Sequence, residues 1–206
     1  MGLEMLGAFT AGLLLITISE LGDKSFFISL CLAMRYPRRW VFVGSATALA
    51  LMTVLSVLMG QAIALVSKDI SRWGMIALFV FFGVKLLWDA WQMGDGSTDE
   101  VQREAIEAIE ADRKSLGSAW AVVSQSFGLT FLAEWGDRTQ FATISLAAAQ
   151  NPVGVVLGAT LGHAICSAIA VYVGKAIAAK LSEKVITAIG GVLFLIFAAW
   201  AAVIPG

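Results

Sequence analysis

Long apolar tracts follow one another along most of the chain, separated by short polar breaks. Each tract is long enough to cross a hydrocarbon layer about 30 Å thick at about 1.5 Å per helical residue. Hydrophobic residues make up 59% of the 206 residues and charged residues only 14%, well outside the range of soluble domains. The tracts are 3–34, 40–66, 73–93, 119–149, 153–179 and 185–204. Because they lack the alternating polarity of barrel strands, they predict an all-α integral membrane protein with six transmembrane helices.

The chain also repeats itself at a constant spacing. The offset that places Glu20 on Glu134 also places Gly22 on Gly136, Asp23 on Asp137, Lys24 on Arg138, Ser25 on Thr139, Gly44 on Gly158 and Gly60 on Gly174. Each half then holds three spans, and an odd number of spans makes the second half enter the membrane from the opposite side. We therefore expect two inverted three-helix repeats, 1–93 and 118–206, an architecture that many transporters build around a central site.

The segment 94–117 between the repeats is acidic overall and predicts a short solvated helix. We expect this helix to begin at a capping box formed by Ser97 and Glu100, with Arg113 and Lys114 at its far end. A thin apolar stripe would pack it on the bundle, and a partner site is the alternative. The stripe consists of Val101, Ala105, Ala108 and Ile109.

Basic residues gather on one side of the predicted membrane. The breaks after the first, third and fifth spans hold Arg35, Arg38, Arg39, Arg103, Arg113, Lys114, Lys180 and Lys184, whereas the other side has Lys68 and Arg72. By the positive-inside rule the first group is cytoplasmic. The linker then lies in the cytoplasm, and both termini are periplasmic or extracellular.

Two motifs place ionisable groups inside apolar tracts, "SELGDKSFF" at 19–27 and "AEWGDRTQF" at 133–141. Their acids are Glu20, Asp23, Glu134 and Asp137, and their bases are Lys24 and Arg138. On a helix, the spacing of three would put both acids of a motif on one face. The two tracts are about 30 residues each, roughly 45 Å if fully helical, so we expect a break or a strong tilt in each. Gly22 and Gly136 are where such a helix can kink.

Oxygen donors dominate both motifs. Ser25, Thr139 and Gln140 add hydroxyl and amide oxygens to the four carboxylates, and neither motif contains His or Cys. Such a site suits Ca²⁺, Mn²⁺ or Mg²⁺ better than Zn²⁺ or Cu⁺. Four negative and two positive charges leave −2 if all are ionised, which one divalent cation or two protons would balance. Since loss of water favours the protonated form of a carboxylate, exchange of one for the other is electrically consistent.

Structural ion pairs, Glu20 with Lys24 and Glu134 with Arg138, are the alternative interpretation. Ionisable groups inside a membrane are costly and usually functional, and two equivalent copies favour a site. His163 could relay protons or bind metal, but a single His in a Gly- and Ala-rich span is more often a hydrogen-bonded packing residue. No phosphate loop, nucleophile triad or nucleic-acid patch is visible in the sequence.

The two motifs share one pattern: Glu, an apolar residue, Gly, Asp, a base, then Ser or Thr. With its copies ELGDKS and EWGDRT in six spans, the sequence resembles the Gdt-type exchanger family of Golgi, chloroplast and bacterial membranes. The resemblance implies transport of Mn²⁺, and for some members Ca²⁺, against protons. It implies that Glu20, Asp23, Glu134 and Asp137 form the cation site, and that 94–117 is the acidic cytoplasmic loop. The absence of the long N-terminal extension of organellar members favours a bacterial form.

We therefore expect an inner-membrane secondary transporter that exports Mn²⁺, or also Ca²⁺, while protons enter; it would not be an enzyme and would need no cofactor. Ser25, Thr139 and Gln140 would support the metal, and Lys24 and Arg138 would tune its charge. Its partners would be the cation, protons and the lipid bilayer, with no nucleic acid; a homodimer is left open. One alternative is an exporter of a small metabolite such as an amino acid, with the acids as a proton relay. Another is an intramembrane metal-dependent hydrolase, which the symmetry of the motifs disfavours.

Overall fold

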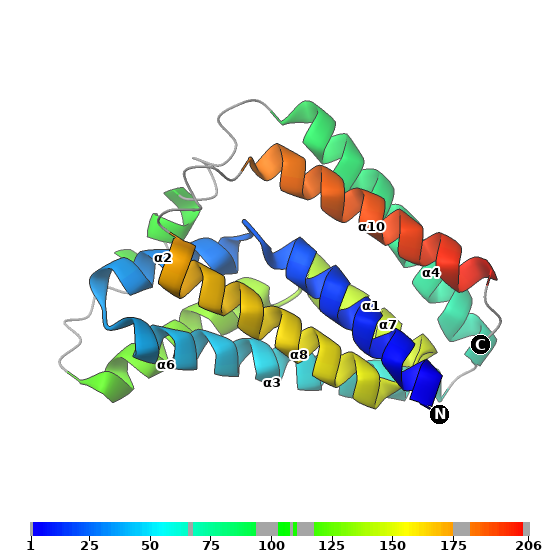
Figure 1. The fold of residues 1–206 in the computed structure, drawn as a ribbon, viewed down its shortest axis with the longest axis horizontal. Coiled ribbons are helices and arrows are strands. Elements are labelled where there is room, and N and C mark those ends of the chain that lie inside the picture. Colours follow the sequence, from blue (N-terminus) through cyan, green and yellow to red (C-terminus); the bar gives the residue numbers. More distant parts are fainter. Residues whose placement is uncertain are drawn as a thin grey trace.

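The computed structural model describes residues 2–65, 68–93, 103–107, 109–110, 118–174 and 182–203. These residues form helices and connecting turns, with no strand among them, so the predicted all-α class is confirmed. Figure 1 shows the helices as long rods lying beside one another. They are α1 (Gly2–Glu20), α2 (Lys24–Arg35), α3 (Arg38–Ala64), α4 (Lys68–Gln92), α6 (Ala119–Glu134), α7 (Arg138–Ala149), α8 (Pro152–Ala168), the π-helical segment η1 (Ile169–Val173) and α10 (Glu183–Val203).

Five of the described helices are long and apolar enough to cross a membrane: Gly2–Glu20, Arg38–Ala64, Asp69–Gln92, Pro152–Val173 and Lys184–Val203. The tract at 119–149, expected as one span, is instead divided into α6 with 16 residues and α7 with 12. The tract at 3–34 is divided in the same way into α1 and α2. The break that tract length predicted is therefore present in both motifs.

Both breaks have the same local geometry. Gly22 and Gly136 each have a φ of 80°, a left-handed conformation that costs energy in any residue with a Cβ. Asp23 and Asp137 follow in extended backbone and cap the next helix, with side chains that accept hydrogen bonds from the backbone N–H groups of residues 24 and 139. Each motif thus ends one helix at its Glu and starts another after its Asp. The expected arrangement, with both acids on one helix face, is wrong for this reason.

The two halves pack by exchanging partners. Helix α1 lies along α8, and α6 lies along α3, while α4 and α10 run beside each other (Figure 1). A Cβ added at Gly158 would collide with the backbone of Phe9 in α1, and one added at Gly44 would collide with the backbone of Val123 in α6. These two contacts are related by the same offset of 114 residues as the motifs. Glycine therefore permits the same close helix approach twice, as is common between membrane helices.

The described part of the linker is helical and packs on the bundle. Ala105 and Ile109 are buried in a cluster that also contains Phe27 of α2 and Val122 of α6. The predicted packing of the apolar stripe is seen for these two residues. The other stripe residues, Val101 and Ala108, and the proposed caps at Ser97, Glu100, Arg113 and Lys114 lie outside the described residues.

Candidate cation site

The two breaks bring three carboxylates together. Glu20, Glu134 and Asp137 each place one oxygen within 4.8 Å of the others, and within the described ranges no other group of three acids, His or Cys does so. Glu20 and Glu134 are the last residues of α1 and α6, and Asp137 caps α7. Oxygens on opposite sides of a Ca²⁺ ion are about 4.6–5.2 Å apart, because each lies about 2.3–2.6 Å from the ion. The spacing therefore suits one hard divalent cation held between the halves.

Hydroxyl groups hold the two glutamates in equivalent ways. Ser25 donates to Oε2 of Glu20 at 3.1 Å, and Thr139 donates toward Oε2 of Glu134 at 3.3 Å. The Thr139 hydroxyl also lies 3.1 Å from Oδ2 of Asp137. Because the capping Asp starts a helix, the hydroxyl two residues later turns back toward the Glu that ended the previous helix. The motif spacing thus fixes the orientation of both glutamates.

Several buried oxygens at the site have no donor. Oε1 of Glu20 makes no hydrogen bond within the described residues, although the side chain is only 1% exposed. The hydroxyls of Thr17 and Ser19 on the same helix are also unsatisfied there. Buried polar atoms are nearly always partnered, so the free Oε1 of Glu20 in particular is available to an ion or water. Carboxylate and hydroxyl oxygens are the ligands that a hard cation requires.

Asp23 is the predicted ligand that is not part of this group of three. Its Oδ2 accepts a hydrogen bond from Nη2 of Arg138 at 3.1 Å, in a pair that is only about a quarter exposed. Arg138 also reaches the backbone oxygen of Ser19 at 3.4 Å. This arginine belongs to the second half, whereas both of its partners belong to the first. The pair therefore ties the two breaks together beside the three-carboxylate cluster.

Lys24 occupies the position equivalent to Arg138 but points elsewhere. Its Nζ lies 3.2 Å from Oε2 of Glu104 in the linker helix, and both side chains are exposed. Of the two bases expected to tune charge, the structure brings only Arg138 to the acids. Neither of the ion pairs considered within a single motif, Glu20 with Lys24 or Glu134 with Arg138, is the pair that forms.

Gln140 lies in the second motif but faces its backbone. Its Oε1 accepts a hydrogen bond from the N–H of Gly136 at 2.7 Å, and its Nε2 lies 3.2 Å from the sulfur of Met52. The amide thus stabilises the break at Gly136. The first motif has Phe26 at the equivalent position and lacks this bond.

His163 lies against the first motif. Its Nδ1 is 3.9 Å from Oε1 of Glu20, and the ring is 5% exposed. The equivalent residue of the other half is Leu49, so only one glutamate faces an imidazole. Sequence reasoning did not single out Thr17, whose backbone oxygen lies 3.1 Å from the thiol of the buried Cys166. The signal for Thr17 was its position three residues before Glu20, on the same helix face.

A small cavity adjoins the Asp23–Arg138 pair. Its volume is about 60 Å³, room for about two water molecules at about 30 Å³ each. The cavity extends from the first break toward α4 and α10, where Thr187 supplies a buried hydroxyl. Polar atoms of both halves thus line one small cavity beside the Asp23–Arg138 pair.

Comparison with known proteins identifies the family. A GDT1-like protein of Synechocystis is 55% identical over 197 residues, covering 94% of this chain and 96% of that protein. The rice chloroplastic GDT1-like protein 2 is 45% identical and the Arabidopsis chloroplastic PAM71-homolog 40% identical, but the chain spans only 59% and 58% of these longer proteins. No solved structure matches the chain. The family profile described as the divalent cation/proton antiporter GDT1 matches residues 8–94 and 122–204. The resemblance in the two motifs is thus confirmed, and the chain belongs to the GDT1 family of divalent cation/proton antiporters.

Proposed function

We propose that this chain is a secondary transporter that exports Mn²⁺ from the bacterial cytoplasm in exchange for protons. Membership of a cation/proton antiporter family supports cation–proton exchange by a membrane protein rather than an enzyme. The observation that carries the proposal is the convergence of Glu20, Glu134 and Asp137 within 4.8 Å at the junction of the halves. Ca²⁺ satisfies the same oxygen chemistry, and the choice of Mn²⁺ rests on the resemblance to bacterial exporters.

Proton exchange follows from the charge of the cluster. Three ionised carboxylates carry −3, and one divalent cation leaves −1 on a group whose two glutamates are buried and whose Asp137 is partly buried. Close like charges disfavour joint ionisation, so when the cation leaves, the acids take up protons. The Arg138–Asp23 pair stays neutral as a unit and holds the breaks in register. Cation and protons thus compete for one set of oxygens.

We propose that the halves are two inverted three-helix repeats, 1–93 and 118–206, joined by the cytoplasmic linker 94–117. The matching breaks, the matching hydroxyl bonds to the glutamates and the exchanged helix partners support this division. In it, α6 and α7 together form the crossing equivalent to α1 and α2, and both termini face the periplasm, as the distribution of basic residues indicates. Rocking of one repeat against the other would open the site to each side in turn.

Transport by purified variants in vesicles tests the site. Glu20→Gln and Asp137→Asn each keep the shape of the side chain but remove a charged ligand, so both should abolish Mn²⁺ flux driven by a pH gradient. Glu107→Gln changes an exposed linker acid and should leave the flux unchanged. Normal flux through either site variant at matched protein levels would refute the assignment. Competition by Ca²⁺ in the same assay ranks the two cations.

A further inference from the structure

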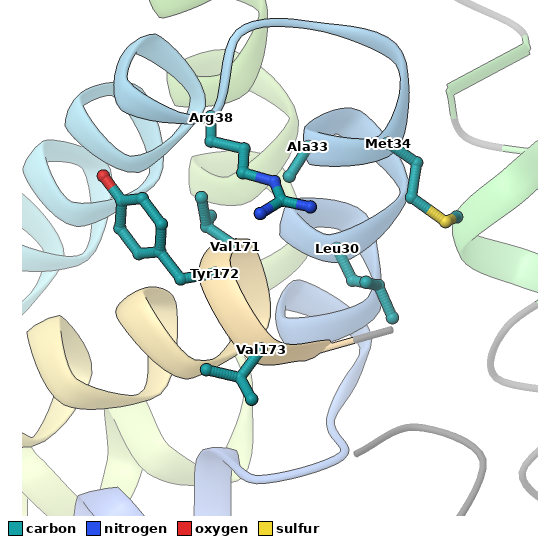
Figure 2. Close-up of a pocket in the computed structure, with 7 residues that line it drawn as sticks. All are labelled: Leu30, Ala33, Met34, Arg38, Val171, Tyr172 and Val173. Atoms are coloured by element: carbon teal, nitrogen blue, oxygen red, sulfur yellow. The ribbon is translucent and has the colours of Figure 1, made fainter. Parts of the chain in front are cut away.

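A second, larger pocket lies away from the carboxylates, between α2, the start of α3 and η1. Its volume is about 310 Å³. Figure 2 shows the Arg38 guanidinium reaching across it toward α2, with Leu30 on one wall and Val171 and Val173 on the other. The pocket is therefore lined mainly by apolar side chains, together with Tyr172 and one cationic group, Arg38.

Three arginines, Arg35, Arg38 and Arg39, flank the turn between α2 and α3 and make it a basic loop. Among the described residues, Arg38 is the one of the three that has no partner. Arg35 pairs with Glu110 at 3.8 Å, and the Arg39 guanidinium lies over the Trp40 ring at 5.0 Å. No such interaction occupies Arg38, whose side chain is exposed. In addition, Arg38 is the first residue of α3, and Pro37 offers no side-chain cap to the N–H groups at this end of the helix. An anion at this position would meet both.

The pocket is not a consequence of the internal repeat. At the equivalent place in the other half, Gly60 closes directly onto the backbone of α7 at Ile144. At its counterpart Gly174, the three atoms nearest to an added Cβ all belong to the side chain of Leu30. The residues before Gly174 form the π-helical η1, whereas those before Gly60 continue as α-helix, and Arg38 has Pro152 as its counterpart. Distortions of this kind are frequent at functional sites.

We propose that this pocket binds one anionic phospholipid of the cytoplasmic leaflet. The phosphate would sit on Arg38, and an acyl chain would lie along Leu30, Val171 and Val173. The choice of lipid over a soluble anion follows from the apolar walls, which a free phosphate would leave unfilled, and from the basic loop, which attracts anionic lipids to a membrane surface. The assignment to the cytoplasmic leaflet rests on the membrane orientation that belongs to the proposed function.

The bound lipid would also act on the cation site through α2. This helix forms one wall of the pocket, begins at the Asp23 cap and carries Ser25, which holds Glu20. A lipid between α2 and η1 would keep these two elements apart. Without it, α2 could move toward η1 and pack as closely as its counterpart α7 packs on α3 in the other half. Anionic lipid should therefore change the transport rate and leave the cation ligands intact.

Native mass spectrometry of the full-length protein in a neutral detergent tests the site, with phosphatidylglycerol and phosphatidylcholine added in turn. The wild type should retain one phosphatidylglycerol in preference to phosphatidylcholine. Arg38→Gln should weaken its retention about tenfold or more, because a charge-assisted hydrogen bond is lost. Val173→Phe, which keeps the charge but fills the pocket, should also weaken it. Arg39→Gln removes a charge from the same turn and should retain the lipid.

Three results would overturn the proposal. Equal losses of bound phosphatidylglycerol in Arg38→Gln and Arg39→Gln would indicate general attraction to a basic surface. Equal retention of phosphatidylcholine and phosphatidylglycerol would indicate binding through the acyl chains alone. Displacement of the lipid by millimolar inorganic phosphate would indicate a soluble anion. Unfolding temperatures without lipid show whether each variant is folded. The unfolding temperature of Arg38→Gln is also measured with Mn²⁺. If Mn²⁺ still raises it, the cation site is intact and the loss of lipid binding concerns the pocket alone.

Discussion

At the scale of single residues, Lys24 and Arg138 show how one motif serves two purposes. Each follows a capping Asp, yet Arg138 binds Asp23 across the two halves and Lys24 binds Glu104 on the linker. Buried charge-assisted bonds contribute about 1.5–3 kcal/mol, whereas exposed ion pairs contribute about 0–1 kcal/mol. The arginine therefore carries more of the stability of the site than the lysine does.

This difference predicts unequal effects of matched substitutions. Arg138→Gln should lower the free energy of unfolding by about 1.5–3 kcal/mol, because Asp23 loses its partner in a partly buried place. Lys24→Gln should lower it by less than about 1 kcal/mol. Denaturant unfolding of both variants in the same detergent measures the two values. Equal losses would contradict the assigned pairings.

The sequence singled out four acids as a candidate set, but how they group in space could not be predicted from it. Two copies of one motif inside apolar tracts identified Glu20, Asp23, Glu134 and Asp137 as a set. Asp23 is bound to Arg138, which lies 115 residues away in the chain, whereas the other three acids form one group. Such a contact is set by how the halves pack, and spacing within a motif carries no information about it.

At the scale of elements, the left-handed glycine in each motif decides where one helix ends and the next begins. Tract length predicted that the helices would break, since about 30 residues exceed one crossing. Length alone could not place the break, and the glycines between the acids marked where a helix can kink. What was not predicted is that the two acids of a motif then belong to different helices. The positive φ at Gly22 and Gly136 explains the difference, because it turns the chain before Asp23 and Asp137 can cap new helices.

Substitution of Gly136 tests this role. Gly136→Ala should cost about 1–2 kcal/mol of stability, because the left-handed conformation is strained in alanine, and Gly136→Asn should cost less. The space around Gly136 is open, so a clash does not contribute. Gly128→Ala, inside α6 and also in open space, should be neutral or slightly stabilising. Thermal unfolding in detergent would contradict this account if both alanines had the same effect.

At the scale of the whole molecule, the site exists only where the two halves meet, so its occupancy should stabilise the complete fold. Mn²⁺ at about 100 times its Kd should add about 2.7 kcal/mol to the free energy of unfolding. Thermal unfolding of the full-length protein with and without Mn²⁺ measures this, with Glu20→Gln as the variant that loses the effect. An exporter of a small metabolite, with the acids as a proton relay, predicts no stabilisation by divalent cations.

The repeat predicted a symmetric molecule, and the structure departs from that symmetry in particular places. His163 faces one glutamate without a counterpart, and η1 opens a pocket where the other half is closed. A periodic sequence pattern reports what the halves share. The differences depend on individual residues such as Leu49 and Pro152 at the counterpart positions, whose effect appears only once the helices are packed.

The exchanged packing of α1 with α8 has a consequence for biosynthesis. Helix α1 buries its small-residue face against α8, which begins much later in the chain, at Pro152. At about 5–20 residues per second, roughly 7–30 s pass before that partner exists. During this time α1 must rest against lipid or an insertion factor. Neither half is then a complete folding unit, and two separately translated halves should recover a fold only when they meet in one membrane.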